Sequence, residues 1–141
     1  MTDLTPSEQY SYMSMWSLMA APLIYSGDIN RVDDFTRNVL CNSEVIEVNQ
    51  DPLGEQARPV VQDEDALILA KPMSDGSLAV GLFNLMEARR KMTVSWDELG
   101  LEGPQRVRDV WRHEDLGTFE DEYTASVRRH GVLFVRLWPE E

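Results

Sequence analysis

Carboxylates are the chemically capable side chains that this sequence supplies in greatest number. Cleavage of a glycosidic bond needs two of them, one as acid or base and one as nucleophile or second base, about 5–5.5 Å or about 6.5–9.5 Å apart. Asp28, Asp33 and Asp34 form the one cluster that directly follows a predicted strand, residues 23–25. Because barrel active sites lie at the carboxyl ends of strands, Asp28 stands where chemistry could occur. Alternatively, Asp28 shapes a turn or caps the next helix, and Asp33 and Asp34 begin a solvated helix.

The other reactive side chains lack the partners that catalysis or metal binding requires. His113 has no nucleophile motif beside it, which favours a loop role, and His130 precedes a glycine, which favours a turn. Lys71 belongs to no phosphate-binding glycine loop, and we expect it to face solvent on a strand. Cys41 is the only cysteine, so no internal disulfide and no cysteine-rich zinc site can form, and we expect a small buried apolar side chain. These residues identify no metal site and no complete catalytic site.

Three tryptophans of the second half leave two functions open. If Trp96, Trp111 and Trp138 were exposed, their rings could stack on sugars, as in a carbohydrate-binding module. Aromatic side chains of this size more often anchor a core or an interface.

Composition narrows the classes of partner. The 141 residues carry 25 acidic and 13 basic side chains, for a net charge of −12. Nucleic acids and anionic membranes both attract basic surfaces, so neither is expected as a partner. No apolar run approaches the roughly 18 residues that a membrane-spanning helix needs. The first ten residues do not resemble a signal peptide, and the compartment stays open.

The first third of the chain predicts helices around one short strand. Thr5, Pro6 and Glu8 predict a capped helix start with a capping box. The helix is expected to run to about residue 21, where Pro22 stops it. Its apolar residues occur almost all the way round, so a chain of this size has difficulty covering them: they are Met13, Met15, Trp16, Leu18, Met19 and Ala20.

The segments after this helix predict one slice of an α/β layer. A short buried strand is expected at residues 23–25, a helix at 31–41, and a short helix at 44–48 that Ser43 can cap. A lone strand of the parallel type cannot stand by itself, so this part belongs to something larger.

The pattern changes to strands after a turn-rich link at residues 49–59. Short strands with turn signals between them predict an antiparallel sandwich. They are expected at residues 60–62, 66–72, 78–84, 90–95, 106–109, 124–128 and 132–137.

Several strings, in this order, resemble the late part of glycoside hydrolase family 27, the α-galactosidases and α-N-acetylgalactosaminidases. The resemblance covers about residues 4–138, and the string NQDPLG at 49–54 is its most specific part. The strings are SMWSLMAAPL at 14–23, GDI at 27–29, EVIEVNQDPLG at 44–54, AKP at 70–72, DGSLAVGLFN at 75–84, VSW at 94–96, VRDVW at 107–111 and HGV at 130–132.

The resemblance implies part of a retaining glycosidase built from a (β/α)8 barrel and a C-terminal antiparallel β-sandwich. Residues 1–55 would be the incomplete end of the barrel, its last helix–strand–helix, and residues 56–141 the sandwich, so that the chain is an α+β fragment. Asp28 would border the sugar pocket. No metal or organic cofactor is implied.

The family's catalytic strings do not occur in this sequence. These are the Lys-Tyr-Asp string of the nucleophile, the acid/base Asp after the sixth strand, and a Trp-Asn-Asp-Pro-Asp string. No catalytic residue is therefore carried over, and we expect a truncated, inactive C-terminal portion of a hydrolase. Only the full-length enzyme would bind the substrate, a terminal α-linked galactose. The cysteine pairs of secreted animal members are also missing, which favours bacterial relatives.

Three further hypotheses accompany this one. In the first, the chain is an autonomous sandwich module that binds carbohydrate or protein. In the second, it is a small enzyme that uses Asp28 with Asp33 or Asp34. Independently, the uncovered apolar helix predicts self-association through residues 10–25, because exposed patches of that size drive association.

Overall fold

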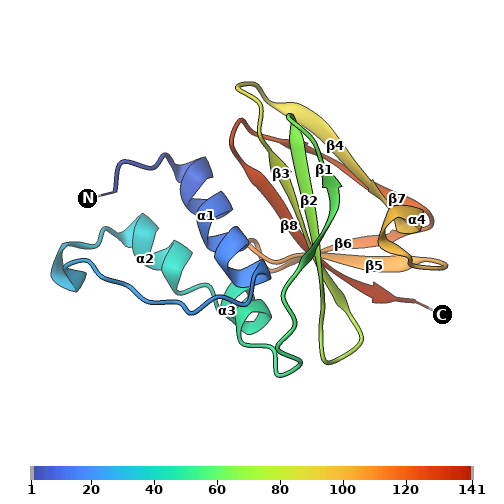
Figure 1. Cartoon of the computed structure of the whole chain (residues 1–141), viewed down its shortest axis with the longest axis horizontal. Coiled ribbons are helices and arrows are strands. Elements are labelled where there is room, and N and C mark those ends of the chain that lie inside the picture. The colour runs from blue at the N-terminus through green and yellow to red at the C-terminus, as the bar shows by residue number, and fades with distance from the viewer. Residues whose placement is uncertain (1, 141) are drawn as a thin grey trace.

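A computed structural model describes residues 2–140 as a helical layer packed against one side of a β-sandwich (Figure 1). The described residues form four α-helices, one 3-10 helix and eight strands. Helices α1 (Pro6–Leu18), α2 (Asp34–Leu40) and α3 (Ser43–Asn49), with the 3-10 helix η1 (Ile29–Arg31), make the helical layer. The predicted fold class, helices of a barrel end followed by an antiparallel sandwich, is confirmed.

The start of α1 is as predicted, and its end comes earlier. Thr5 caps the helix, Pro6 holds the first position, and Glu8 completes the capping box. The helix ends at Leu18 instead of residue 21, because Ala20 adopts a left-handed conformation with φ of 50° that a helix cannot continue through.

The strand predicted at residues 23–25 is wrong: no strand occurs between α1 and β1. Ile24 is 83% exposed and Tyr25 49% exposed, so the segment is not buried either. The apolar run was interpreted as a parallel strand, and such a strand needs hydrogen-bonded neighbours and a covered face. The described residues provide neither, and the segment crosses the helical layer without pairing.

The shorter helices differ slightly from the prediction. Asp33 caps α2, so the helix begins at Asp34, after η1, and not at residue 31. Asn42 caps α3 in place of Ser43, which is the first helical residue. Cys41 follows α2 and is exposed, so the expectation of a buried side chain is wrong.

Two antiparallel sheets form the sandwich. One has the order β1-β2-β3-β8-β5-β6, and the other pairs β4 with β7. The last strand along the chain therefore lies in the middle of the larger sheet, between β3 and β5. The strands are β1 (Arg58–Gln62), β2 (Ala66–Pro72), β3 (Leu78–Asn84), β4 (Arg90–Ser95), β5 (Gln105–Asp109), β6 (Glu114–Phe119), β7 (Glu122–Val127) and β8 (Val132–Pro139).

The strand prediction missed β6, and the short helix α4 (Trp96–Leu99) was also missed. No residue of β6 is buried, and the strand pairs only with β5 at the sheet edge. An edge strand of this kind shows no alternation of apolar and polar residues, which is the signal that predicts strands.

The core consists of two apolar clusters, one on each face of the larger sheet. The first fills the space between the sheets, with Ile68, Val80, Leu82, Val94, Val107, Val135 and Leu137 among its members. The second joins sheet and helices, with Met13, Leu18, Val45, Val48, Leu69, Phe83 and Phe134 among its members. The division predicted between residues 55 and 56 stays a prediction, and this second cluster draws residues from both sides of it.

Gly81 lets α1 approach the sheet closely. A Cβ atom on Gly81 would lie 2.5 Å from Cδ1 of Leu18, which is fully buried. The bare backbone of β3 therefore provides the depression that receives the last turn of α1.

Candidate functional site

The three aspartates of the predicted cluster occupy local structural roles. Asp28 accepts a hydrogen bond from the Asn30 amide at 3.0 Å and caps η1. Asp33 accepts one from the Thr36 amide at 2.7 Å and caps α2, and Asp34 pairs with Arg37 at 2.9 Å. The capping alternative is confirmed for Asp28. Whether this residue also borders a sugar pocket stays a prediction.

An apolar groove runs beside these aspartates, between α1, α2 and residues 23–27. Its volume is about 590 Å³, and Met13, Leu23 and Val39 lie along it. Its rim is unusually exposed for apolar side chains: Tyr12 is 56% and Trp16 39% exposed, and their rings stack with centroids 5.4 Å apart. The groove, here called the open groove, is lined by residues of α1, α2 and the segment 23–27, which ends one residue before Asp28.

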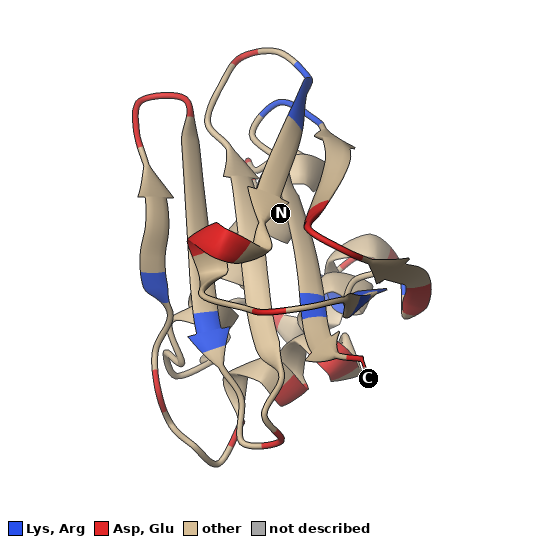
Figure 2. Ribbon diagram, turned by 90° about the vertical axis from the view of Figure 1, so that its right-hand side faces the viewer, with Lys and Arg blue, Asp and Glu red and all other residues tan. Residues whose placement is uncertain are grey.

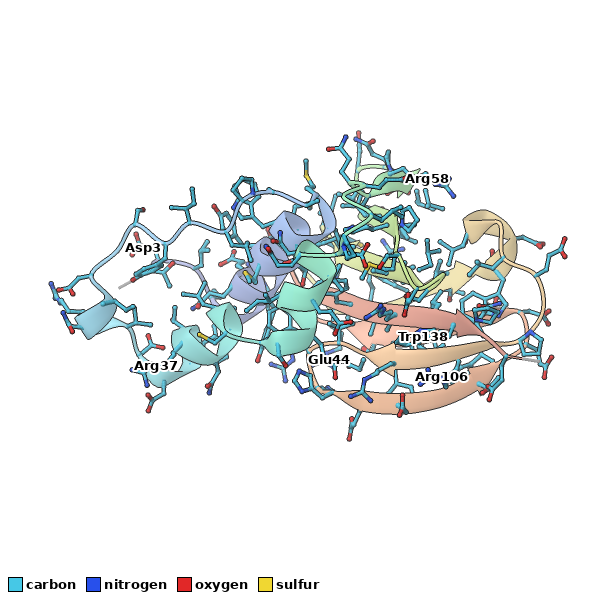
Figure 3. The ribbon with its side chains drawn as sticks, turned by 90° about the horizontal axis from the view of Figure 1, so that it is seen from below. Asp3, Arg37, Glu44, Arg58, Arg106 and Trp138 are labelled. Atoms are coloured by element: carbon cyan, nitrogen blue, oxygen red, sulfur yellow. The ribbon has the colours of Figure 1, made fainter. Side chains whose placement is uncertain are left out.

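The joint between helices and sandwich is polar as well as apolar. Arg108 of β5 donates to Glu44 of α3, which Figure 3 labels, through two nitrogens, Nη2 at 2.6 Å and Nε at 3.0 Å. Both side chains are only 24% exposed. This hydrogen bonding from Glu44 raises the pKa of Arg108 further above its ordinary value. A forked pair with this geometry fixes orientation as well as distance.

Trp111 and its neighbours reinforce the joint. Its indole Nε1 donates to Ser14 Oγ at 2.8 Å, and its carbonyl accepts from Asn42 Nδ2 at 3.1 Å. About one turn nearer the start of α1, Ser11 Oγ donates to the His130 carbonyl at 2.7 Å. Side chains of α1 and of the α2–α3 turn are thus tied to turns of the sandwich.

A second charged cluster surrounds Arg136 of β8. Its guanidinium donates to Ser77 Oγ at 2.7 Å, Glu47 at 2.8 Å and Asp75 at 2.9 Å. Burial would raise the pKa of Asp75, but hydrogen bonds from Ser77 and Trp138 and the charge of Arg136 outweigh it and hold the pKa well below its ordinary value. Glu47 makes this cluster part of the same joint.

The tryptophans do not form an exposed platform. Trp96 is 3% exposed and donates to the Phe119 carbonyl, while Trp111 is part of the joint. Trp138 is half-buried, and the guanidinium carbons of Arg106 and Arg136 lie 4.4 and 4.9 Å from its ring centroid. Figure 3 labels Trp138 and Arg106. The core-or-interface interpretation holds for these rings, and the exposure that a sugar platform needs is missing.

Lys71 is fully buried, so the expectation of a solvent-facing position is wrong. Its Nζ has no hydrogen-bond partner among residues 2–140. Burial lowers the pKa of this amine, and the charges of Asp51 and Glu55 oppose that shift. Strand alternation carried the missed signal, since Leu67, Leu69 and Lys71 alternate along β2 and both leucines belong to the cluster that joins the sheet to the helices.

Both histidines lie in turns, as predicted. His113 has φ of 57° and contacts Asn42 Oδ1 at 3.0 Å. His130 has φ of 50° and lies between Glu8 at 3.2 Å and Glu87 at 3.0 Å. Among residues 2–140, no group of three or more histidine, cysteine or acidic side chains could hold a metal ion. No helix in the described part is long and apolar enough to cross a membrane.

Two family models match the chain in succession. One, described as alpha galactosidase C-terminal beta sandwich domain, matches residues 63–137. The other, described as alpha galactosidase A, matches residues 2–51. Residues 52–62, between the two matches, contain most of the connector from α3 to β1 and also β1 itself.

Curated relatives match nearly the whole chain. An α-galactosidase of Cyamopsis tetragonoloba is 37% identical over 138 residues, which are 96% of this chain and 34% of that protein. A probable α-galactosidase of Dictyostelium discoideum is also 37% identical, over 96% of this chain and 37% of that protein. The chain thus spans about a third of the length of these relatives.

Solved structures share the fold over nearly the full chain. A family 27 β-L-arabinopyranosidase of Geobacillus stearothermophilus has a TM-score of 0.93 at 32% identity, covering 99% of this chain and 32% of that one. An α-galactosidase I of Mortierella vinacea has a TM-score of 0.92 at 26% identity, covering 97% of this chain and 36% of that one. Helical layer and sandwich are therefore arranged as in these larger proteins.

Proposed function

Because the chain belongs to the α-galactosidases of glycoside hydrolase family 27 and corresponds to their C-terminal portion, we propose that it completes and stabilises a catalytic barrel. The observation that carries this proposal is the match of a barrel-type and a sandwich-type family model, in order, to a chain about a third as long as its relatives. The helical layer is the part that would join the barrel. The sandwich would hold that layer in place.

The chemistry of the whole enzyme would be double displacement at a sugar. A retaining glycosidase uses two carboxyl groups about 5–5.5 Å apart, one as nucleophile and one as acid and base. Both would lie outside this chain, since its own clustered aspartates cap helices or pair with arginine. This chain would instead support the barrel wall, because α1 and the side chains of the open groove would pack against the other elements of the barrel.

Two related sugars are candidates for the substrate. Curated relatives at 37% identity are named α-galactosidases, which supports a terminal α-linked galactose. The solved relative at 32% identity is named a β-L-arabinopyranosidase. The two sugar rings share their hydroxyl arrangement and differ by the hydroxymethyl group of galactose, so one pocket type suits both.

The test is a chimera that joins this chain to the first two-thirds of the Cyamopsis tetragonoloba enzyme. The purified chimera is expected to hydrolyse an aryl α-galactoside or an aryl β-L-arabinopyranoside. This chain alone, and the Cyamopsis portion alone, are expected to be inactive on both. Turnover by this chain alone that follows the protein through purification would contradict the proposal, as would a folded chimera without activity.

The chimera also tests the proposed role of Asp28 at the border of the sugar pocket. Asp28→Asn is expected to raise KM by about tenfold, because a carboxylate that accepts from sugar hydroxyls bonds more strongly than an amide. The matched control is Asp34→Asn, since Asp34 is exposed and pairs with Arg37. If the two variants have equal KM values, Asp28 does not border the sugar pocket.

A further inference from the structure

A second cleft lies where the start of α1 meets the sandwich. Its volume is about 460 Å³, the size of a small-molecule site. Tyr10 of α1, Trp111 after β5 and Tyr123 of β7 bring three aromatic side chains to its wall. The cleft therefore joins segments that are more than 100 residues apart in the sequence, and the joint described above holds them together.

Three arginines also line this cleft: Arg89, Arg112 and Arg128. Arg89 and Arg128 make no ion pair or side-chain hydrogen bond with any of residues 2–140. The Nε of Arg112 is 3.8 Å from Asp109, and its side chain is 74% exposed. Three arginine residues with free guanidinium donors thus line one cleft in a chain whose net charge is −12.

Two neighbouring loops at one end of the sandwich carry basic residues, and acidic residues of the β1–β2 and β3–β4 loops lie at the same end. Figure 2 shows blue ribbon in neighbouring loops there, and an ion pair of 2.6 Å between Arg129 and Glu87 joins the β3–β4 and β7–β8 loops. Of the 13 basic residues, five lie in these loops or at their strand ends: Arg89, Arg90, Lys91, Arg128 and Arg129. Guanidinium forks match carboxylates with two parallel hydrogen bonds, so Arg89 and Arg128, which make no ion pair with any of residues 2–140, suit an anionic group.

The remaining polar groups of the cleft suit hydroxyls. Asp109 is 8% exposed and accepts one hydrogen bond, from the Arg112 amide at 3.0 Å, which leaves acceptor capacity. The hydroxyls of Tyr10 and Tyr123 make no hydrogen bond among residues 2–140. Aromatic walls, hydroxyls and a carboxylate beside arginines together fit a sugar that carries its own carboxylate.

We propose that this cleft binds a uronic acid unit of a short oligosaccharide. The arginines hold the sugar's carboxylate, and Asp109 with the tyrosine hydroxyls bonds its ring hydroxyls. The site goes beyond the proposed function; the choice of a sugar rests on that function, whereas carboxylate binding rests on the cleft alone. A long polyanion is disfavoured because the acidic chain repels it.

The experiment titrates the isotopically labelled chain with digalacturonate and records its amide NMR spectrum. Saturable shifts are expected at residues 109–112 and 123–134, and neutral galactobiose is expected to bind at least about tenfold more weakly. Arg89→Gln and Arg128→Gln are each expected to weaken digalacturonate binding by about fivefold or more. Arg58→Gln is the matched control, because Arg58 is exposed and lies on β1 outside the cleft.

Several results would overturn the proposal. If digalacturonate causes no saturable shifts, the cleft does not bind it. The same conclusion follows if Arg58→Gln weakens digalacturonate binding as much as the two cleft variants do. A Glu-Glu dipeptide that binds as tightly as digalacturonate removes the sugar assignment. None of these readouts needs catalytic turnover, so failure here is distinct from failure of the chimera.

Discussion

Two buried cations on the larger sheet have opposite surroundings. Arg136 is bonded to Ser77, Glu47 and Asp75. Lys71 is fully buried, and its Nζ has no hydrogen-bond partner among residues 2–140. Burial disfavours the charged form of a lysine, so Lys71 opposes folding while Arg136 is compensated.

We therefore expect Lys71→Met to raise the free energy of unfolding by about 1 kcal/mol at neutral pH, since an apolar side chain of similar length suits the site. The lowered pKa of Lys71 means that the unfolded chain binds more protons between the folded and the ordinary pKa. Stability of the unsubstituted chain should then rise with pH up to the ordinary lysine pKa, and Lys71→Met should lack that rise. Urea unfolding at neutral and alkaline pH measures both.

Lys91→Met is the control for this prediction, because Lys91 is the other lysine and is exposed. It should leave the free energy of unfolding and its pH dependence unchanged. A loss of stability in Lys71→Met alone would show that the amine has a favourable partner.

Asp75 leads to a prediction about the free energy of unfolding at low pH. Its pKa is held below the ordinary value of about 3.9, so the group contributes stability above that pH and loses it as pH falls toward the lower folded pKa. Asp75→Asn should lower the free energy of unfolding by about 1–2 kcal/mol at pH 7, a figure that allows for its 44% exposed side chain, and should flatten the decline below pH 4. Urea unfolding at both pH values checks this, with the exposed Asp97→Asn as control; equal curves for the two variants would contradict it.

At the scale of elements, the joint rests on the pair between Arg108 and Glu44. Arg108→Ala removes a forked pair and leaves Glu44 partly buried without it, so the free energy of unfolding should fall by about 1–3 kcal/mol. The comparison variant is Arg37→Ala, whose ion pair with Asp34 is exposed and is expected to contribute less than about 0.5 kcal/mol.

A double-mutant cycle with Glu44→Ala separates the pair from other effects of each truncation. A coupling of about 1 kcal/mol or more is expected. Additive losses would mean that Arg108 acts through Asp115, its second partner at 3.4 Å, and not through the helical layer.

Elements with a local signal were predictable. The bounds of β2, β3 and β4 agree with the expected ranges, because each alternates apolar and polar faces or ends at a turn signal. The edge strand β6 lacks such alternation, and the expected strand at residues 23–25 needed neighbours that the described residues do not include. An apolar run alone could not tell these cases apart.

The site was less predictable than the fold. The capping role of Asp28 follows from its position before a helix, and it was foreseen as the alternative. Arg108 and Glu44 are 64 residues apart, and no local pattern pairs them. The arginines of the second cleft come from three separate segments, so only the sheet register and the turn after β5 bring them together.

At the scale of the whole molecule, the open groove is the feature that lacks a cover. We propose that the isolated chain forms a homodimer through residues 10–25, because Tyr12, Trp16, Met19 and Ile24 are exposed there. Trp16→Glu should make the chain monomeric, since a buried unpaired carboxylate opposes association. Light scattering over a concentration series measures the mass.

Leu53→Glu is the control for this prediction, because Leu53 is 45% exposed and lies in the connector between α3 and β1, outside the open groove. It should dimerise like the unsubstituted chain. A single mass equal to that of the monomer at every concentration would contradict the proposed dimer.

The central place of β8 has a consequence for the order of folding. The strand fills the larger sheet between β3 and β5, yet it is synthesised after both of them. Until then β3 and β5 present bare edges, and the platform for α1 lacks Phe134. Helices α1, α2 and α3 precede β8 in the chain, so the surface on which they pack is complete only after β8 is made. We therefore expect this part of the protein to fold slowly and to be prone to aggregation during synthesis.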